Sequence, residues 1–525
     1  MGSFAKKSTE ADATRTSGAH PPLAGRTSGP SEDTRSMNFR THPFKRGHLA
    51  FVAVLAVLLG GVAFACGTDD GNGAGPCEGA SCDGGSESST TDGPGTDTSI
   101  GDGGGGGDAH ADSSIQVSCG EAGAGTLDPA FGDGGVVVLT YPSSSANSVV
   151  VQPDGKIVIG GYTAQSLALV RLMPDGSLDS TFGSTGFVQV PLGDFGAIVS
   201  ALALQADGKI VGAGSAHIPG SPAGDRGDFA IIRFLANGSL DPTFGDAGIV
   251  TTNIGGTDQA YAVAVLADGH VLASGNTGKP SDFAVVRYNA DGSLDATFGS
   301  GGKVATDVGG FLDHAYGMAV LPDGRIVLGG GSSEDGGAVS NTHFSAARYN
   351  ADGSPDTSFA DAGAFVANDV GTFADIARAL VSDQAGKLVL AGGRNGDFTL
   401  VRLTAGGSID GTFGSGGFAA TDFGGDDTAM TLRVQVDGKL LASGIRGVGA
   451  NPSTDLVIAR YLAAGSLDPS FGLAGKVITS FGTLFGAVGN AEAVTGCGLI
   501  VVGTLSDTTG QSLNPTAMLI TRYGL

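Results

Sequence analysis

Short apolar runs separated by Gly, Asp and Pro recur along residues 120–525. Typical runs are "YAVAVL" (261–266), "VLA" (271–273) and "FAVVRY" (283–288), which are rich in Val, Leu and Ala. None sustains a helical period, and their length and composition predict β-strands. Turns such as "ADGH" (267–270) between two runs predict tight hairpins, because their Gly supplies the positive φ that such turns need.

Three features recur seven times in a fixed order, which indicates an internal repeat. A phrase such as "DGSLDATFG" (291–299) places its Phe at Phe131, Phe182, Phe244, Phe298, Phe359, Phe413 and Phe471. The tight turns place their Gly at Gly155, Gly208, Gly269, Gly324, Gly386, Gly438 and Gly498. The Arg that ends an apolar run is Arg171, Arg233, Arg287, Arg348, Arg402, Arg460 and Arg522.

Each repeat offers four strands: one after the Phe-Gly, one before the turn, one after it and one ending in Arg. We expect the phrase to carry the chain from one four-stranded unit to the next, with its Leu and Phe in the seam. Its Asp is expected to cap backbone N–H groups or to pair with the recurrent Arg; a Ca²⁺ role for Asp291 and Asp295 is the alternative.

The predicted fold class is all-β, a seven-bladed β-propeller of four-stranded repeats over residues 119–525, and the alternative is an open β-repeat solenoid or two sheet modules. Closure removes exposed sheet edges. The series begins with a phrase, "GTLDPAFG" (125–132), and has none after Arg522, which is the arrangement expected of a closed ring.

Loop lengths distinguish two faces of the expected ring. The spacing from Arg to the next Phe is 11 in all six cases, whereas the spacing from turn Gly to Arg ranges from 16 to 25. We call the side that carries the Gly turns and the phrases the standard face, and the side that carries the other two loops of each repeat the variable face.

The combination "DGSLDxTFG", "DGKIV" and "FAVVRY" resembles the delta-60 repeat, a β-rich motif of predicted secreted and surface proteins of bacteria, notably deltaproteobacteria. The resemblance covers residues 120–525 and implies no characterised activity. Ala360 departs from it where the phrase has Gly, and so do Ala385 and Cys497 in two of the turns.

The first part of the chain reads as an export segment and a tether. Residues 1–36 are predicted to be disordered, and Met37 is a candidate start that leaves them untranslated. Residues 37–66 form a signal peptide whose end, "AFAC", resembles a lipobox and makes Cys66 the lipidated residue. Ordinary cleavage with release, or an uncleaved anchor, are the alternatives. The Gly-, Asp- and Ser-rich residues 67–118 form a disordered tether.

Two disulfides are predicted in the exported protein, because an oxidising compartment allows them to persist. Cys77 and Cys82 close a small loop in the tether. Cys119 precedes the first phrase and Cys497 lies in the last turn, so both belong to the standard face and form a clasp that closes the ring. The alternative is two unrelated thiols.

A formal net charge of -24 argues against nucleic acid or an anionic membrane surface as a partner. No nucleophile elbow, HExxH, P-loop or paired CxxC occurs. Asp residues open two strands per repeat on the variable face, and their convergent oxygens predict a Ca²⁺ site or a surface for a basic partner. Capping of loops by the same side chains is the alternative. One arc is Asp258, Asp313, Asp375 and Asp427, and the other is Asp228, Asp282, Asp397 and Asp455.

The predicted function is a non-enzymatic binding protein, monomeric and anchored to the cell envelope, at the outer membrane or cell surface. Its ligand, a protein or a polysaccharide, binds at the variable face. No Trp is present for sugar stacking, although Tyr261 and Tyr316 are available. The alternatives are a Ca²⁺-dependent propeller enzyme of lactonase or hydrolase type and a purely structural envelope component; secretion or a periplasmic location is the alternative localisation.

Overall fold

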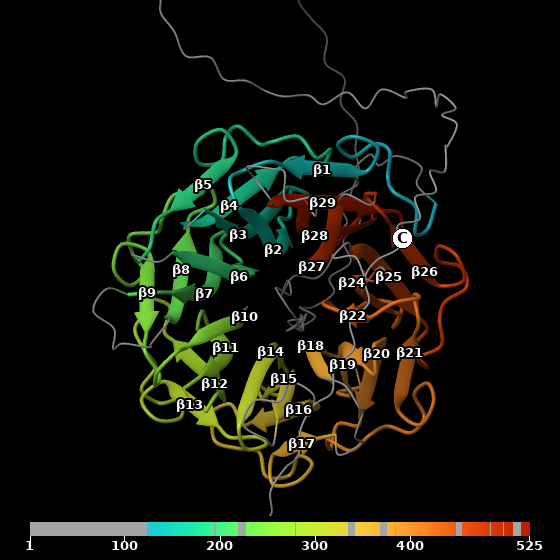
Figure 1. Cartoon of the computed structure of the whole chain (residues 1–525). Coiled ribbons are helices and arrows are strands. Elements are labelled where there is room, and N and C mark those ends of the chain that lie inside the picture. Colours follow the sequence, from blue (N-terminus) through green and yellow to red (C-terminus); the bar gives the residue numbers. More distant parts are fainter. Residues whose placement is uncertain are drawn as a thin grey trace, which may run out of the picture. The chain divides into compact units, whose positions relative to one another are not determined.

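The protein forms a ring of seven β-sheets around one axis (Figure 1). The computed structural model describes residues 123–164, 166–193, 196–218, 227–278, 280–333, 342–367, 375–383, 385–447, 454–482, 485–496, 498–507 and 516–525. Across these ranges every regular element is a strand, which confirms the predicted seven-bladed propeller of four-stranded antiparallel repeats. None of the described residues belongs to a helix long and apolar enough to cross a membrane.

Each sheet runs outwards from the axis through four positions (Figure 1). The innermost strands are β2 (Ser144–Val151), β6 (Ala197–Leu204), β10 (Gln259–Val265), β14 (Leu312–Val320), β18 (Ile376–Ser382), the pair β22 (Asp427–Ala429) and β23 (Arg433–Val434), and β27 (Phe485–Thr495). The second strands are β3 (Ile157–Thr163), β7 (Ile210–Ala216), β11 (Val271–Thr277), β15 (Ile326–Ser333), β19 (Leu388–Arg394), β24 (Leu440–Gly447) and β28 (Gly498–Asp507).

The third strands carry the recurrent Arg. They are β4 (Ser166–Leu172), β8 (Asp228–Phe234), β12 (Asp282–Tyr288), β16 (Thr342–Tyr349), β20 (Asp397–Leu403), β25 (Thr454–Tyr461) and β29 (Thr516–Tyr523). The outermost strands are β5 (Phe187–Val190), β9 (Ile249–Thr252), β13 (Lys303–Thr306), β17 (Ala364–Val366), β21 (Phe418–Thr421), β26 (Lys476–Thr479) and β1 (Val136–Leu139). Short outermost strands limit the edge that each sheet presents to another chain.

Each blade begins one strand later than the sequence analysis assumed. The strand after the Phe-Gly is the outermost strand of its sheet, as β13 is in the sheet β10-β11-β12-β13. The phrase therefore joins the third strand to the outermost strand of the same blade, and the expectation that it leads into the next blade is wrong. The chain crosses between blades after the outermost strand, for example along residues 253–258.

Seven hydrophobic cores lie between neighbouring blades, one for each seam. Strand β8 shows how one strand serves two seams: Phe229 and Ile231 pack toward the next blade, whereas Ala230 and Ile232 pack toward the preceding one. Both faces of a strand are thus buried, which explains why its sequence is a continuous apolar run. The seven phrase Phe side chains are fully buried, as predicted, whereas the phrase Leu178 is 42% exposed.

The two ends of the repeat series meet in the last blade. Strand β1 pairs antiparallel with β29, from Val136 opposite Thr521 to Leu139 opposite Met518. The first described strand thus supplies the outermost strand of the seventh sheet. Backbone hydrogen bonds between β1 and β29 therefore close the ring. This closure was predicted from the phrase that precedes the first repeat.

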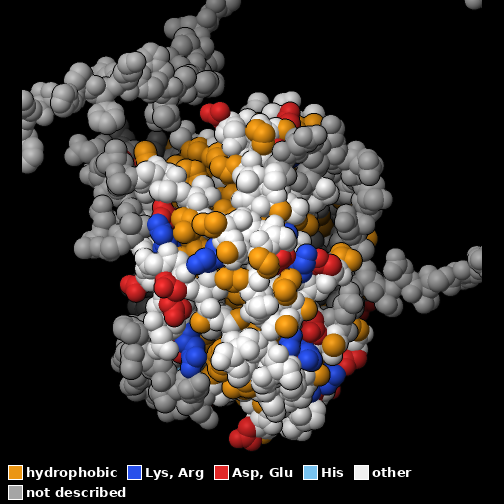
Figure 2. Space-filling view, turned by 90° about the vertical axis from the view of Figure 1, so that its right-hand side faces the viewer, with side chains coloured by type: hydrophobic (Ala, Val, Ile, Leu, Met, Phe, Trp, Pro, Cys, Tyr) orange, Lys and Arg blue, Asp and Glu red, His pale blue; other side chains and the backbone are white. Residues whose placement is uncertain are grey.

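The outer wall carries mixed charges. On the side that Figure 2 shows, basic and acidic side chains lie near one another, with hydrophobic side chains in a broken band among them. Lys303 and Lys476, which open two outermost strands, each donate from Nζ to a backbone carbonyl of the preceding blade, that of Asn253 at 2.6 Å and that of Asp422 at 3.1 Å. These two lysines therefore link neighbouring blades. The side shown in Figure 2 has no large patch of a single charge.

Candidate functional site

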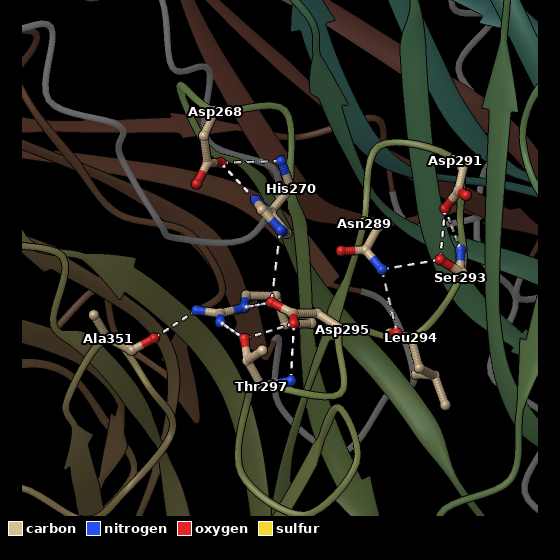
Figure 3. A network of polar contacts seen from close by, with 10 residues as sticks. Asp268, His270, Asn289, Asp291, Ser293, Leu294, Asp295, Thr297 and Ala351 are labelled. Atoms are coloured by element: carbon tan, nitrogen blue, oxygen red, sulfur yellow. Dashed lines mark hydrogen bonds and ion pairs between the residues drawn. The ribbon is translucent and has the colours of Figure 1, made fainter.

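The phrase builds a hydrogen-bonded joint around Asp295 (Figure 3). Arg287 donates from Nε to Asp295 Oδ2 at 2.6 Å and from Nη1 to the Ala351 carbonyl of the next repeat at 2.5 Å. Its guanidinium carbon lies 4.6 Å from the centre of the Phe298 ring, a cation–π contact. Asp295 Oδ1 accepts hydrogen bonds from the N–H and the hydroxyl of Thr297, and these bonds, followed by Arg287, lower the pKa of Asp295 to about 2.

The same joint recurs around the whole ring. The ion pairs are Arg171–Asp179, Arg233–Asp241, Arg287–Asp295, Arg348–Asp356, Arg402–Asp410, Arg460–Asp468 and Arg522–Asp128. Each of these Arg side chains also lies over the Phe of its own phrase. The predicted pairing of the phrase Asp with the recurrent Arg, and its capping of backbone N–H groups, are both confirmed.

A belt of backbone hydrogen bonds links each phrase to the next. The N–H and C=O partners are Gly132 and Asp175, Gly183 and Asn237, Gly245 and Asp291, Gly299 and Asp352, Ala360 and Gly406, Gly414 and Ala464, and Gly472 and Ala124. The last of these bonds, 3.0 Å long, closes the belt across the ends of the series. On the standard face, the same contacts therefore join neighbouring repeats around the whole ring.

The turn cation adds to these contacts. In most repeats a Lys or Arg after the turn Gly reaches the phrase Asp of its own blade, as Lys156 reaches Asp179 at 3.2 Å. His270 takes that place in the third repeat, with Nε2 3.6 Å from Asp295 Oδ2 and Nδ1 3.0 Å from Asp268 Oδ1 (Figure 3). His270 therefore stands where most repeats have a Lys or Arg.

The first arc of predicted site residues lies where the innermost strands begin, on the variable face. Asp258 Oδ2 accepts a hydrogen bond from the Ile254 N–H at 2.6 Å, and its Oδ1 accepts one from the Thr277 hydroxyl at 2.5 Å. Asp313 Oδ2 accepts one from the Val308 N–H at 2.6 Å. These carboxylates thus hold the loops that cross between blades.

The other two residues of this arc act similarly. Asp427 Oδ2 accepts a hydrogen bond from the Phe423 N–H at 2.6 Å, and Asp375 Oδ1 accepts one from the Asn395 N–H at 3.2 Å. Asp375 Oδ2 also lies 3.4 Å from Nε of Arg394. All four carboxyl groups are buried, and burial raises the pKa of each.

Two residues of the first arc differ from the rest, because one carboxylate oxygen is buried without a hydrogen-bond partner. These are Oδ1 of Asp313 and Oδ1 of Asp427. Burial first, and then the nearby charges of Asp307 and Asp282, raise the pKa of Asp313 to about 6. Over the part of the chain that the structure describes, no three His, Cys, Asp or Glu side chains gather in an arrangement that could hold a metal ion. The Ca²⁺ site stays a prediction.

The second arc opens third strands on the same face. Asp455 Oδ2 lies 2.6 Å from Nη2 of Arg446, and Asp228 Oδ1 accepts a hydrogen bond from Nδ2 of Asn253 at 2.8 Å. Asp282 and Asp397 are partly exposed at the first position of their strands. Asp455 and Asp228 thus pair with neighbouring side chains, and all four carboxyl groups add to the acidity of the variable face.

A β-bulge interrupts the innermost strands at equivalent positions. Six innermost strands leave one residue unpaired, and the seventh is divided into β22 and β23. The residues there are Asn147, Ser200, Tyr261, Tyr316, Arg378, Met430 and Asn490, which we call the inner ring. All seven are partly exposed. A bulge re-aims the side chain that it carries, so these residues lie at the edge of each sheet that faces the axis.

Side chains of the inner ring contact the innermost strand of a neighbouring blade. Asn490 donates from Nδ2 to the Ala146 carbonyl at 2.9 Å, and Asn147 donates from Nδ2 to the Val199 carbonyl at 3.1 Å. The innermost strands begin at the variable face and end at the Gly turns, and the bulges lie near their beginnings. The inner ring therefore lies toward the variable face.

One arc of the inner ring is aromatic and cationic. The rings of Tyr261 and Tyr316 are 4.8 Å apart, and the guanidinium carbon of Arg378 lies 4.4 Å from the centre of the Tyr316 ring. His314, two residues before Tyr316, stacks on it at 5.8 Å with an interplanar angle of 13°. Tyr261 donates its hydroxyl to Gln259 Oε1 at 2.6 Å. We call these five residues, from β10, β14 and β18, the inner arc.

The inner arc holds polar groups that the protein itself does not satisfy. Arg378 has no acidic partner among the described residues, in contrast to the seven Arg of the phrase joints. Nδ1 of His314 is buried and has no hydrogen-bond partner. Burial, and then the charge of Arg378, lower the pKa of His314, so its imidazole is neutral near pH 7. Burial also raises the pKa of Tyr261.

His314 and Arg378 were not predicted as site residues, and Tyr261 and Tyr316 were predicted only as available aromatics. A signal was present: each of Tyr261, Tyr316 and Arg378 stands three residues after a strand-opening Asp. The residue type at that position varies from repeat to repeat, whereas an Ala lies directly before or after it in every repeat.

The predicted lipidation and disulfide residues cannot be placed. Cys66, Cys77, Cys82, Cys119 and Cys497 lie outside the described residues. Lipidation of Cys66 and the clasp between Cys119 and Cys497 stay predictions, and so do the boundaries assigned to residues 1–36, 37–66 and 67–118.

Six segments match a family model described as "Domain of unknown function (DUF5122) beta-propeller": residues 152–182, 205–244, 266–298, 321–359, 386–413 and 435–471. Each segment ends at the Phe of a phrase. The chain is a β-propeller repeat protein. No curated protein matches it.

Several solved structures resemble this β-propeller at low identity. A virginiamycin B lyase from Staphylococcus aureus has a TM-score of 0.42 and 13% identity, over 74% of this chain and 98% of the other. The polysaccharide lyase Uly1 has 0.41 and 12%, over 81% and 98%. A gluconolactonase from Xanthomonas campestris has 0.33 and 14%, over 78% and 99%. At these values the likeness carries no argument about what the chain binds or catalyses.

Proposed function

We propose that this β-propeller is a non-enzymatic binding protein of the cell envelope that takes its ligand on the axis, at the variable face. The observation that carries the proposal is the inner arc. The phrase joints repeat seven times, whereas Tyr261, Tyr316 and Arg378 occupy equivalent positions with different chemistry. Recognition of a ligand without internal symmetry needs unlike groups around the ring.

The composition of the inner arc supports binding more than catalysis. Aromatic faces with a few placed polar groups are typical of ligand sites. A side-chain nucleophile is activated by an adjacent base. Among the described residues, His314 has ring and charge contacts with Tyr316 and Arg378 and no hydrogen-bonded nucleophile.

The anchor is a separate part of the proposal. The signal-like residues 37–66 and the Gly- and Asp-rich residues 67–118 support a lipid anchor at Cys66 followed by a tether. Labelling with a radioactive fatty acid should mark the wild-type protein and not Cys66→Ser. Equal labelling of both forms would remove the lipid anchor and leave the binding role intact.

Binding is tested with the full-length protein against a panel of envelope polysaccharides and purified envelope proteins, by calorimetry. We expect a ligand whose affinity falls at least 10-fold in Tyr316→Ala and stays unchanged in Asp291→Asn, a phrase variant on the standard face. The recovered ligand should have an unchanged mass and an unchanged NMR spectrum. A ligand that is cleaved or isomerised would favour the alternative, a propeller enzyme. An affinity that is unchanged in Tyr316→Ala would refute the inner arc as the binding site.

A further inference from the structure

Arg378 is an unusual cation in this protein. The described residues carry many acids, and the phrase Arg side chains all pair with one. Arg394 and Arg446 likewise pair with Asp375 and Asp455. Arg378 instead has only the Tyr316 ring, although it lies on an innermost strand among partly exposed side chains.

A guanidinium without a carboxylate partner in a partly buried place favours an anion. The planar guanidinium matches a carboxylate with two parallel hydrogen bonds, and stacking on Tyr316 fixes its plane. Such a charge-assisted pair gains strength where water is partly excluded. The buried Nδ1 of His314 lies on a ring that stacks on the same tyrosine, which places a second unsatisfied polar atom beside the same contact.

The two tyrosines and Gln259 of the inner arc suit a ligand that contains a sugar ring with hydroxyl groups. Tyr261 and Tyr316 present aromatic faces, onto which the C–H groups of a sugar ring can pack. The amide of Gln259 adds a hydrogen-bonding group on the same innermost strand as Tyr261. A protein partner would need an interface of about 20–30 residues a side, whereas the inner arc is a small group of side chains on three strands, which suits a small ligand better.

The overall charge limits how many anionic groups the ligand carries. A net charge of -24 repels a polyanion, and one unpaired Arg offers a single charge to oppose it. We propose, resting on the binding function above, that the inner arc takes a glycan bearing one carboxylate, a uronic acid whose carboxylate pairs with Arg378 and whose ring packs against Tyr261 and Tyr316.

The test compares a disaccharide that carries one uronic acid with its methyl ester, titrated into the full-length protein by calorimetry. The ester keeps the hydroxyl groups, removes the negative charge and adds one methyl group. We expect the acid to bind at least 10-fold more tightly than the ester. Arg378→Gln should weaken the acid by about 10- to 100-fold and abolish the difference between the two ligands.

Two variants separate binding from folding. Arg378→Lys keeps the charge and loses the planar fork, so it should restore only part of the affinity. Ser200→Ala, at the equivalent bulge of another blade, should leave the preference for the acid unchanged, and all variants should keep the wild-type Tm. Equal affinity for acid and ester, or a preference that survives Arg378→Gln, would overturn the carboxylate assignment while leaving a neutral glycan as ligand. Failure of both disaccharides to bind would overturn the glycan class and leave the binding function to be tested with the protein panel.

Discussion

The two faces of this propeller use the same strands for different purposes. On the standard face, one Arg, one Asp and one Phe meet in the same geometry seven times, and six of the Arg side chains also donate to a carbonyl of the next repeat. Around the axis near the variable face, equivalent bulges carry Asn, Ser, Tyr, Arg and Met. A repeated contact stabilises every seam equally, whereas a binding site needs positions that are free to differ. Under the proposed function, stability and recognition belong to different ends of one sheet.

The closing strand offers the largest disturbance of the standard face. Removal of residues 123–139 takes away β1, the partner of β29, and also the phrase residue Asp128 that pairs with Arg522. An open edge of the seventh blade would then be exposed. We expect loss of cooperative unfolding and association into oligomers, measured by calorimetry and light scattering. Removal of residues 67–90 from the predicted tether is the control, and a cooperative monomer after loss of β1 would contradict the closed ring.

Low pH should protonate the Asp residues of the phrase joints over one narrow pH range and so break their ion pairs with Arg. Asp241, Asp295 and Asp468 have pKa values lowered to about 2, and the pKa values of Asp179, Asp356 and Asp410 are lowered as well. A carboxyl whose pKa is lower in the folded state contributes stability above its unfolded pKa, about 4, and loses it as the pH falls through the folded value. The free energy of unfolding should therefore fall steeply between about pH 4 and pH 2.

A denaturant titration at each pH measures this. The slope below pH 4 should be smaller in Asp295→Asn, which lacks one of the titrating groups. Constant stability down to pH 2 would show that the joints do not depend on charge.

A single joint can be broken without changing its shape. Asp295→Asn keeps an oxygen for the Thr297 N–H and removes the charge that faces Arg287. Because the partly buried Arg287 then lacks its charged partner, we expect a loss of about 2–4 kcal/mol in the free energy of unfolding. Asp291→Asn is the matched control, since the side chain of exposed Asp291 bonds only Ser293, and this variant should lose far less stability. Equal losses would contradict the special role of the joint.

The predicted Ca²⁺ site on the variable face can be tested by its effect on stability. A site of millimolar affinity would raise the free energy of unfolding by about 1.4 kcal/mol at 10 mM Ca²⁺. Asp313 and Asp427 keep an unbonded buried oxygen, so the pair Asp313→Asn and Asp427→Asn should abolish the rise. Asp258→Asn, whose oxygens both accept hydrogen bonds, should retain it. No Ca²⁺ effect on the wild type would leave these residues with the loop-holding role alone.

The smallest expected change in stability concerns the phrase in which Ala360 stands where the other six phrases have Gly. Ala360 adopts a φ of 46°, in the left-handed region that favours glycine. Ala360→Gly should therefore stabilise the protein by up to about 1 kcal/mol. Gly414→Ala at the equivalent place should do the opposite, because an added Cβ would lie 2.0 Å from the Phe418 carbonyl oxygen. Denaturant midpoints of the two variants should move in opposite directions, and a shift in the same direction would contradict the strain at Ala360.

Repetition decides which of these features the sequence alone predicts. Phe298, Arg287 and Asp295 recur with fixed spacing in every repeat, so their contact and the sevenfold ring were predictable. The blade phase was not, because the strand at 303–306 has the same local pattern whether it opens a blade or closes one. Only its pairing with β12 decides the matter.

The inner arc shows a different limit of sequence analysis. Tyr316 and Arg378 are 62 positions apart and belong to different blades, and Arg stands at the bulge position in only one of the seven repeats. Their contact depends on the closure of the ring and on a bulge in each innermost strand. Local propensity contains neither piece of information, so the arc became visible only in three dimensions.

The central claim is that the standard face holds the ring together and the inner arc binds the ligand. The most direct test measures unfolding free energy and affinity for the uronic acid disaccharide in the same two variants, Asp295→Asn and Arg378→Gln. Asp295→Asn should lose about 2–4 kcal/mol of stability and bind as the wild type does. Arg378→Gln should unfold as the wild type does and bind about 10- to 100-fold more weakly. If either variant loses both properties, or if the two losses are exchanged, the division between the two regions is contradicted.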